Sequence, residues 1–511
     1  MSDSWLVDTF AIIGFDYSSL PLSNDSIGLL AGKIVNDRPK VLFRFPHVSV
    51  DSSDLGQIDH VANLIEFCQP NGWLYHKKWE APQFHMIVLT DTPGCRMYAA
   101  VYNLFEPVRI LKDVPGDDGS LHEDTEHEQE NIDGSSSIRT ASNHGRNTPV
   151  RRNSITSQIE TGQRRNSRSS IKSSSTVDSK TVNDEQFIYL PKSLLIISKF
   201  NFPEIFRTCL NVVYRASLER MTRFPMELVV GNLIASVLMP PHGYPPISFT
   251  LGIGPRLSVR QTVYRTVPAT GTIVYQLFHY LGIHNTVVTL CCLLNEFKVV
   301  LHSTSLNHLT QCCQAFVALL YPLPFYHVYI PVLPQSITDM LSAPTPFLIG
   351  IHSSLRHEAI AQPDLVVVDL DTGNVRLPES TRLLQLPEKL HLKVTGDLMR
   401  VLNPELFTAD CAFIFPLPSF PSSLSSSVTD EDKNLMDKMI RACFLRLFAS
   451  IFAGYRQSLS AIRICPEPKI VFDKAHFAGQ RGEAFSPTEN LQCMLLNSFF
   501  PQFLQVSFSS H

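Results

Sequence analysis

The sequence lacks features that several classes of protein require. Its most apolar run, residues 228–239, is too short to cross a bilayer, and its first residues hold no basic stretch of the kind that opens a secretory signal. A formal net charge of −4 over 511 residues favours neither nucleic acid nor an anionic membrane as a partner. We therefore expect no transmembrane segment, no nucleic-acid partner, and only peripheral contact with membranes, made through other proteins.

The cysteine pattern does not fit a disulfide framework or a metal site. The eleven cysteines are an odd number, and most lie in apolar runs, including the neighbours Cys291–Cys292 and Cys312–Cys313. We read them as reduced core thiols, which predicts a cytoplasmic protein. Neighbouring residues on a helix point about 100° apart and cannot both face one ion, and His284, His302 and His308 lack ligand spacing. We expect no metal and no cofactor.

Two short motifs imitate catalytic signatures. Cys209 and Arg215 have the spacing of a cysteine phosphatase, but a phosphate loop needs small residues, and the chain has Leu, Val, Val and Tyr between them. We predict a helix with a buried thiol there. Residues 371–373 read Asp-Thr-Gly, as in an aspartic protease, but that mechanism needs a second such carboxylate and the chain has no second copy. A tight hairpin turn is the better interpretation.

Other catalytic patterns are also weak. Residues 251–255 carry two glycines but lack the third glycine of a dinucleotide-binding loop. The Ser, His and Asp set or the G-x-S-x-G elbow that a hydrolase would need does not stand out. We therefore assign no catalytic residue and expect no covalent chemistry.

The clearest pattern in the sequence covers residues 296–353. It predicts a strand, a long helix, a second strand, a short helix and a third strand, in that order. The run 297–302 is rich in branched apolar residues, as in a strand buried on both faces. Residues 303–305 suit a helix start, and apolar residues then recur every three or four positions until Pro322. This order predicts an α/β lobe with a parallel sheet.

The first hundred residues predict a mostly antiparallel sheet, which resumes with strands over 187–198 and a helix from Pro203. The insert between them, residues 114–185, is acidic at first and then basic and serine-rich. It has too few apolar residues for their burial to offset the conformational entropy lost on folding, so we predict disorder.

Within the insert, Ser154 and Ser167 each follow an Arg-Arg-Asn triplet, the pattern of basophilic kinase substrates. We predict phosphorylation there; an unmodified solvated linker is the alternative.

Four further predictions concern the remaining chain. Residues 247–251 and 259–263 are strand candidates, and residues 365–377 read as a hairpin. The Pro/Leu/Ser-rich stretch 383–427 is predicted to be irregular. A long amphipathic helix is expected from Lys433 onward.

Several of these segments resemble one known family. The central part of a DENN domain is similar, in order and spacing, to residues 318–322, 329–334 and 341–350. A narrower group, the myotubularin-related SET-binding-factor proteins, is similar to residues 67–73, 444–449, 454–456 and 466–468.

The resemblance implies a tripartite DENN organisation. It places a longin-like upstream lobe over residues 1–220, a central α/β lobe over 221–354 and a downstream part over 355–482. Residues 483–511 do not follow the family pattern, and the resembling family continues into pleckstrin-homology and phosphatase-like domains. We therefore expect a divergent tail on a chain truncated after its DENN part.

The resemblance also implies a function. DENN proteins act in membrane trafficking as guanine-nucleotide exchange factors for Rab-type small GTPases. The resemblance implies that two lobes of the protein bind the switch regions of the GTPase between them and stabilise its nucleotide-free form. The alternative is a non-catalytic module that binds a GTPase or a myotubularin-related partner. Either function implies a cytoplasmic protein that is peripheral at endomembranes. No motif of the resemblance assigns the residues that contact the GTPase.

Overall fold

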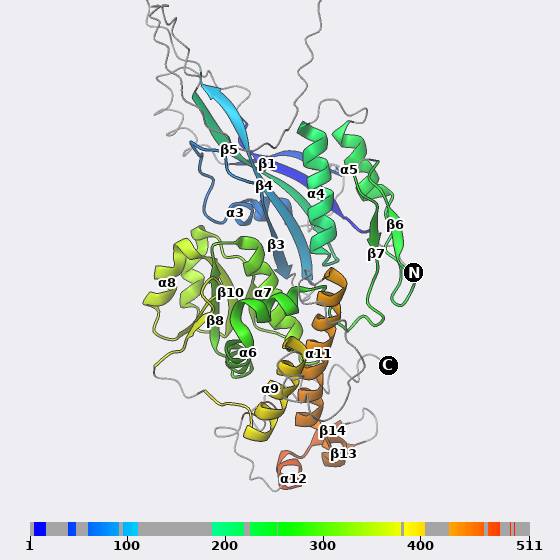
Figure 1. Cartoon of the computed structure of the whole chain (residues 1–511), viewed down its shortest axis with the longest axis vertical. Coiled ribbons are helices and arrows are strands. Elements are labelled where there is room, and N and C mark those ends of the chain that lie inside the picture. Colours follow the sequence, from blue (N-terminus) through cyan, green and yellow to red (C-terminus); the bar gives the residue numbers. More distant parts are fainter. Residues whose placement is uncertain are drawn as a thin grey trace, which may run out of the picture. The chain divides into compact units, whose positions relative to one another are not determined.

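The computed structural model describes residues 5–16, 39–46, 60–90, 96–110, 186–218, 225–252, 254–379, 383–403, 429–463 and 469–480, with Leu491 and Leu495. The predicted disorder of the insert, both candidate phosphorylation sites and almost all of the tail lie outside these residues, so those expectations stay predictions. The described chain is mixed α/β, with two five-stranded sheets and two short ribbons (Figure 1).

The upstream lobe holds an antiparallel sheet, as the sequence predicts. Every neighbouring pair in its order β2-β1-β5-β4-β3 runs antiparallel. Its strands are β1 (Thr9–Gly14), β2 (Lys40–Phe45), β3 (Gln83–Thr90), β4 (Arg96–Ile110) and β5 (Gln186–Ser198). Strand β5 pairs with both β1 and β4, so the chain on the two sides of the insert belongs to one sheet.

Helices cover both faces of this sheet. Leu194 and Ile196 of β5 face the core beneath α4 (Pro203–Leu218) and α5 (Met226–Ala235). Leu195 and Ile197 face the opposite core, which is closed by α2 (His60–Asn63) and α3 (Ile65–Cys68). Because side chains alternate along a strand, the unbroken apolar run in β5 fills both cores.

The second five-stranded sheet is the predicted parallel sheet, in the order β12-β11-β8-β10-β9, and its strands β11 and β12 come from residues after 354. We call this sheet and the helices that cover it the central lobe. Only β12 runs antiparallel, in its hairpin with β11. Its strands are β8 (Lys298–Ser303), β9 (Val328–Ile330), β10 (Phe347–His352), β11 (Leu365–Asp369) and β12 (Asn374–Arg376). The crossover helix α7 (Leu306–Leu319) begins after Ser305, whose hydroxyl accepts a hydrogen bond of 3.5 Å from the His308 N–H.

Helices also cover the parallel sheet on both faces. One face packs against α7 and α6 (Ile273–Leu294), and the other against η1 (Gln335–Ser342), η2 (Ser353–Leu355) and α8 (Arg356–Ala361). Within the described chain α6 is the one helix long and apolar enough to cross a membrane, and 61% of its most apolar window is buried inside the fold. Gly282, at φ +70°, kinks α6 and divides it into two helical segments.

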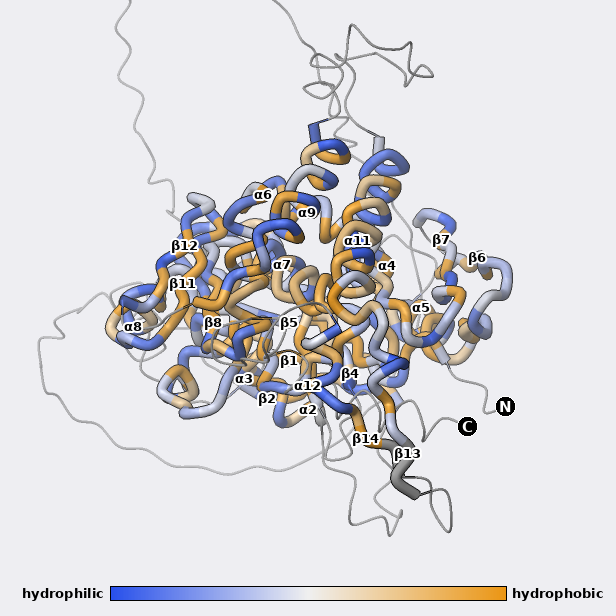
Figure 2. Tube along the Cα trace, turned by 90° about the horizontal axis from the view of Figure 1, so that it is seen from below, coloured by the Kyte–Doolittle hydropathy of each residue, from blue (hydrophilic) through white to orange (hydrophobic). Residues whose placement is uncertain are grey.

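The downstream part is more helical than the sequence predicts. Residues 383–427 were expected to be irregular, but α9 (Glu388–Leu402) forms inside that stretch. The helix buries Val394 and Leu398, which are four residues apart and so lie on one helical face. This short helical pattern is hard to recognise in the sequence, because the residues around it are rich in proline and serine. Helix α11 (Asp430–Phe452) confirms the predicted amphipathic helix, and both helices alternate between hydrophobic and hydrophilic residues in Figure 2. The elements η3 (Tyr455–Ser458), β13 (Leu459–Arg463), β14 (Lys469–Phe472) and α12 (Lys474–Gly479) follow.

The upstream and central lobes are in direct contact. Strand β3 packs on α7, and Val88 of β3 joins the core of the central lobe. The Arg96 guanidinium of β4 donates a hydrogen bond of 3.0 Å to the Phe325 carbonyl and lies 5.3 Å from the centre of the Tyr329 ring. The carbonyl of Pro70 accepts a hydrogen bond of 2.9 Å from the Gln335 N–H. Part of the motif at residues 67–73 thus lies at this contact.

Candidate functional site: the cavity between the two lobes

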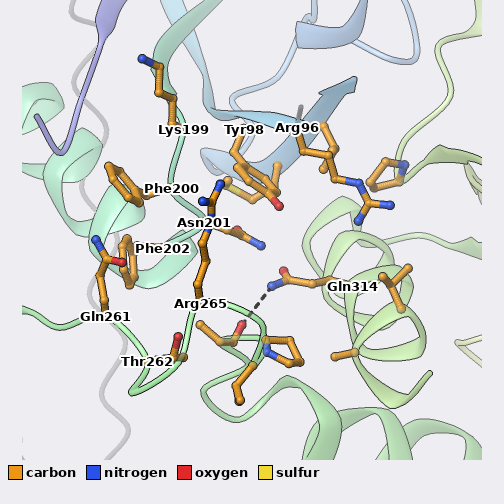
Figure 3. A pocket seen from close by; sticks show the side chains of 18 of the residues that line it. Arg96, Tyr98, Lys199, Phe200, Asn201, Phe202, Gln261, Thr262, Arg265 and Gln314 are labelled. Atoms are coloured by element: carbon orange, nitrogen blue, oxygen red, sulfur yellow. Dashed lines mark hydrogen bonds between the residues drawn. The ribbon is translucent and has the colours of Figure 1, made fainter. Parts of the chain in front are cut away.

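A cavity of about 730 Å³ lies where the two lobes meet (Figure 3). Its walls come from five separated parts of the chain: strands β3 and β4, the turn between β5 and α4, His242 after α5, the loop before α6, and helix α7 with β9. Concave sites of this size commonly bind ligands or partner side chains. We therefore take the cavity as the candidate functional site.

The upstream wall combines apolar and aromatic groups. Met86, Val88 and Tyr98 come from β3 and β4, and Phe200 and Phe202 from the turn after β5. Burial raises the pKa of the Tyr98 phenol. Tyr98 therefore keeps its proton at neutral pH and can serve as a hydrogen-bond donor.

The opposite wall is the loop of residues 260–269, which follows the ribbon of β6 (Ile247–Phe249) and β7 (Leu257–Val259). The sequence predicts a strand over 259–263, but pairing stops at Val259 and the chain turns away from the ribbon. The side-chain amide of Gln314 on α7 donates a hydrogen bond of 3.5 Å to the Ala269 carbonyl, which closes this side of the cavity (Figure 3).

The cavity wall is positively charged. Arg96, Lys199 and Arg265 line it, and none of the lining residues is an aspartate or a glutamate. Arg265 is exposed, and within the described ranges it forms no ion pair. The side-chain oxygen of Asn201 is shielded from solvent, yet it accepts no hydrogen bond in the described part of the chain. This wall therefore suits a partner that brings carboxylates and hydrogen-bond donors.

Side chains of the downstream helix α11 form hydrogen bonds to the end of the 260–269 loop and to the start of α6. Asp437 is fully buried and accepts hydrogen bonds from the Thr270 hydroxyl at 2.5 Å and the Val274 N–H at 2.8 Å. Arg441 donates to Asp437 at 3.1 Å and to the Pro268 carbonyl at 3.0 Å. Burial raises the pKa of the Asp437 carboxyl, although the hydrogen bond from Thr270 and the charge of Arg441 oppose that shift. The downstream part therefore fixes the position of a cavity wall.

The structure confirms the structural interpretation of the two catalytic look-alikes. Cys209 is fully buried in α4, and burial raises its thiol pKa to about 12, so the thiolate that a phosphatase needs does not form. Asp371, Thr372 and Gly373 form the turn between β11 and β12, with Gly373 at φ +76°. The N–H groups of Asp371 and Thr372 donate to Asp369 at 3.0 and 3.1 Å, as expected for a turn.

A polar cluster outside the cavity lies at the carboxyl ends of β8, β10 and β11. In it Ser353, His302 and Asp369 follow one another in the order of a Ser, His and Asp catalytic set. The separations are 3.4 Å from Ser353 Oγ to His302 Nδ1 and 3.8 Å from His302 Nε2 to Asp369. The second separation is too long for a hydrogen bond, and the Ser353 hydroxyl also donates to Asp371 at 3.3 Å.

Asp371 is the acceptor at the centre of this cluster. The Ser303 hydroxyl and the Thr304 N–H donate to it at 2.7 and 2.8 Å. Partial burial opposes its ionisation, but the hydrogen bonds from Ser303, Thr304 and Ser353 outweigh that cost and lower its pKa. The cluster therefore ties the β11–β12 turn to the end of β8. We assign it a structural role.

Motifs in the sequence pointed to few of the cavity residues: Ala318, Tyr329 and Pro331 lie in the segments that resemble a DENN domain, but the polar lining residues do not. Arg96, Lys199, Asn201, Arg265 and Gln314 are distant in sequence and belong to no recognisable pattern. Among the described residues no group of three or more His, Cys, Asp or Glu side chains could hold a metal ion, and His284, His302 and His308 are not brought together as ligands. The predicted absence of metals and cofactors stays a prediction.

Comparisons with known families match the two regions that build the cavity. Residues 39–104 match the uDENN domain, and residues 189–373 match the DENN (AEX-3) domain. Every residue lining the cavity lies within these two stretches. The boundaries predicted at residues 220, 354 and 482 stay predictions.

Two relatives are similar to parts of the chain. One is Myotubularin-related protein 5 from Caenorhabditis elegans, 31% identical over 197 residues, which are 39% of this chain and 11% of the relative. The other is the DENN domain and WD repeat-containing protein SCD1 from Arabidopsis thaliana, 27% identical over 289 residues, which are 56% of this chain and 23% of the relative. The matches thus span less than a quarter of either relative.

Proposed function

Because the chain contains a uDENN domain and a DENN domain, we propose that it is a guanine-nucleotide exchange factor for a Rab-type small GTPase. DENN domains in general serve as exchange modules for Rab GTPases, and they are associated with GTPase regulation rather than covalent catalysis. The observation that carries the proposal is that both matched regions supply walls of one cavity.

An exchange factor of this kind works by differential binding. It accelerates nucleotide release when it binds the nucleotide-free GTPase more tightly than the nucleotide-bound form. Contacts between the lobes and the switch regions would take the place of contacts to nucleotide and magnesium. The mixed apolar and cationic wall of the cavity is chemically suited to such a protein surface.

Partner and location extend the proposal. We place the protein in the cytoplasm and peripherally at endomembranes, where Rab GTPases act in trafficking. A myotubularin-related partner is a second proposal, motivated by the likeness to Myotubularin-related protein 5.

The test is release of a fluorescent guanine nucleotide from a panel of purified Rab GTPases, with and without the full chain. We expect acceleration for one or a few members. Ala269, an exposed residue of the cavity wall, gives a variant that fills the site: Ala269→Trp should reduce acceleration at least tenfold. Ala361→Trp, at the last residue of α8, which is also exposed, is the matched control and should leave the rate unchanged.

Two results would change the conclusion. A well-folded chain that retains a Rab on an affinity column without accelerating release would support the non-catalytic binding module. A chain that neither binds nor accelerates any Rab would contradict the proposal.

A further inference from the structure

The loop beside the cavity exposes large apolar side chains. Val263 and Tyr264 are 54% and 69% exposed, and Tyr244 on the neighbouring turn is 61% exposed. The two turns are adjacent, because His242 Nδ1 lies 2.9 Å from the Thr262 carbonyl. Tyrosine and arginine dominate the binding energy of many protein interfaces, and Arg265 is the next residue in this loop.

Hydrogen bonds brace the loop in spite of its exposure. The Thr262 hydroxyl donates to the Tyr264 carbonyl at 2.8 Å, and the Val267 N–H donates to the same carbonyl at 3.2 Å. Farther along, Gln314 and Arg441 bind the carbonyls of Ala269 and Pro268. A loop that is already held in shape loses less conformational entropy when a partner docks on it.

Arg265 links this apolar surface to the cavity. Figure 3 shows its side chain extending from the loop toward Asn201, opposite Gln314. It lines the cavity and, as described above, has no ion-pair partner among the described residues. A carboxylate of a bound protein could therefore pair with it without breaking an existing ion pair.

We propose that residues 263–265 form the contact that selects the GTPase. In this arrangement Val263 and Tyr264 pack into an apolar depression on the GTPase, and Arg265 pairs with a carboxylate at its edge. The inference rests on the proposed function, because the loop borders the same cavity. A second copy of this chain is a poorer occupant, because a two-fold contact pairs this surface with itself and the cavity wall beside it holds no aspartate or glutamate that could pair with Arg265.

Two variants test the loop. Tyr264→Ala should weaken GTPase binding about tenfold or more, as loss of a central tyrosine does at many interfaces. Arg265→Glu should weaken binding by a similar factor, and binding should then respond less to added salt. Both side chains are exposed, so unfolding midpoints should stay at the wild-type value.

Matched controls are available on α9. Leu392→Ala removes an apolar side chain that is 63% exposed, and Lys389→Glu reverses an exposed charge. Both should leave binding and exchange within twofold of wild type. Replacing a carboxylate of the GTPase by lysine should restore binding to Arg265→Glu but not to Tyr264→Ala.

The readouts separate the two proposals. If the wild-type chain accelerates exchange or binds a Rab, and both Tyr264→Ala and Arg265→Glu match it within twofold, the assignment of this loop is overturned while the proposed function stands. If the wild-type chain neither binds nor exchanges any Rab, both proposals fail together.

Discussion

The carboxylate of Asp437 accepts a hydrogen bond of 2.8 Å from the backbone N–H of Val274, in the first turn of α6. The residue that precedes α6, Thr272, provides no side-chain cap. Asp437, from a helix 163 residues farther along the chain, therefore caps α6 in its place. The same carboxylate binds Thr270, so one acid joins the central lobe, the downstream helix and the cavity wall.

Asp437→Asn should destabilise the fold. The amide keeps one acceptor but loses the charge that pairs with Arg441, and a buried charged hydrogen bond contributes about 1–3 kcal/mol. Urea unfolding should show a loss in that range, and exchange activity should fall as the loop loosens. Asp430→Asn is the control: its carboxylate is 88% exposed, so the loss should stay below about 0.5 kcal/mol. Equal losses in the two variants would argue against the capping role.

Gly350 should not tolerate a side chain. A Cβ added at this position in β10 would lie 2.0 Å from the Pro331 carbonyl oxygen and 2.9 Å from Leu309 Cγ. Relief of that overlap requires backbone movement, so Gly350→Ala should cost about 1–3 kcal/mol of unfolding free energy. A Cβ at Gly396 in α9 meets nothing within 4 Å, so Gly396→Ala should be neutral or stabilising by up to about 1 kcal/mol. Thermal unfolding of both variants measures the contrast.

His85 should make stability fall in mild acid. It is fully buried, and burial lowers its pKa from 6.5 to about 4, although a hydrogen bond to the Phe67 carbonyl opposes the shift. Between these two values the unfolded chain takes up a proton that the folded chain does not. The contribution of His85 is therefore complete above pH 6.5 and declines by about 3 kcal/mol as the pH falls toward 4.

The measurement is the urea midpoint of wild type and His85→Gln across this pH range. Glutamine can still donate to the Phe67 carbonyl but does not titrate, so the variant should show a flatter pH dependence. Parallel curves for the two proteins would exclude His85 as the source of acid sensitivity.

Cys209 should be chemically inert in the folded protein. Its thiol pKa of about 12 leaves almost no thiolate at neutral pH, and the side chain is not accessible. Iodoacetamide followed by mass spectrometry should find Cys209 unmodified until denaturant is added. Rapid and selective alkylation of Cys209 in the native chain would reveal an activated thiol and reopen the phosphatase interpretation.

The sequence by itself determined the elements whose cause is local. The apolar run of β8, the capped three- and four-residue period of α7 and the Asp-Thr-Gly turn were all predictable, because neighbouring residues set them. The same reasoning placed Cys209 in a helix, since bulky residues surround it in the chain. Helix α9 was missed because its surroundings in the sequence resemble a loop.

Tertiary structure alone decided the cavity and its wall. Residues 260–263 have strand-like neighbours, yet pairing stops at Val259 and the chain turns toward α7 and α11. The bonds that fix this turn join residues that are 45 and 173 positions apart, and Asp437 reaches Thr270 across 167 positions. The local pattern of apolar and polar residues cannot indicate such partners, because they come into contact only when separate helices, strands and loops pack together. For that reason the sequence could indicate the fold but not the polar residues of the site.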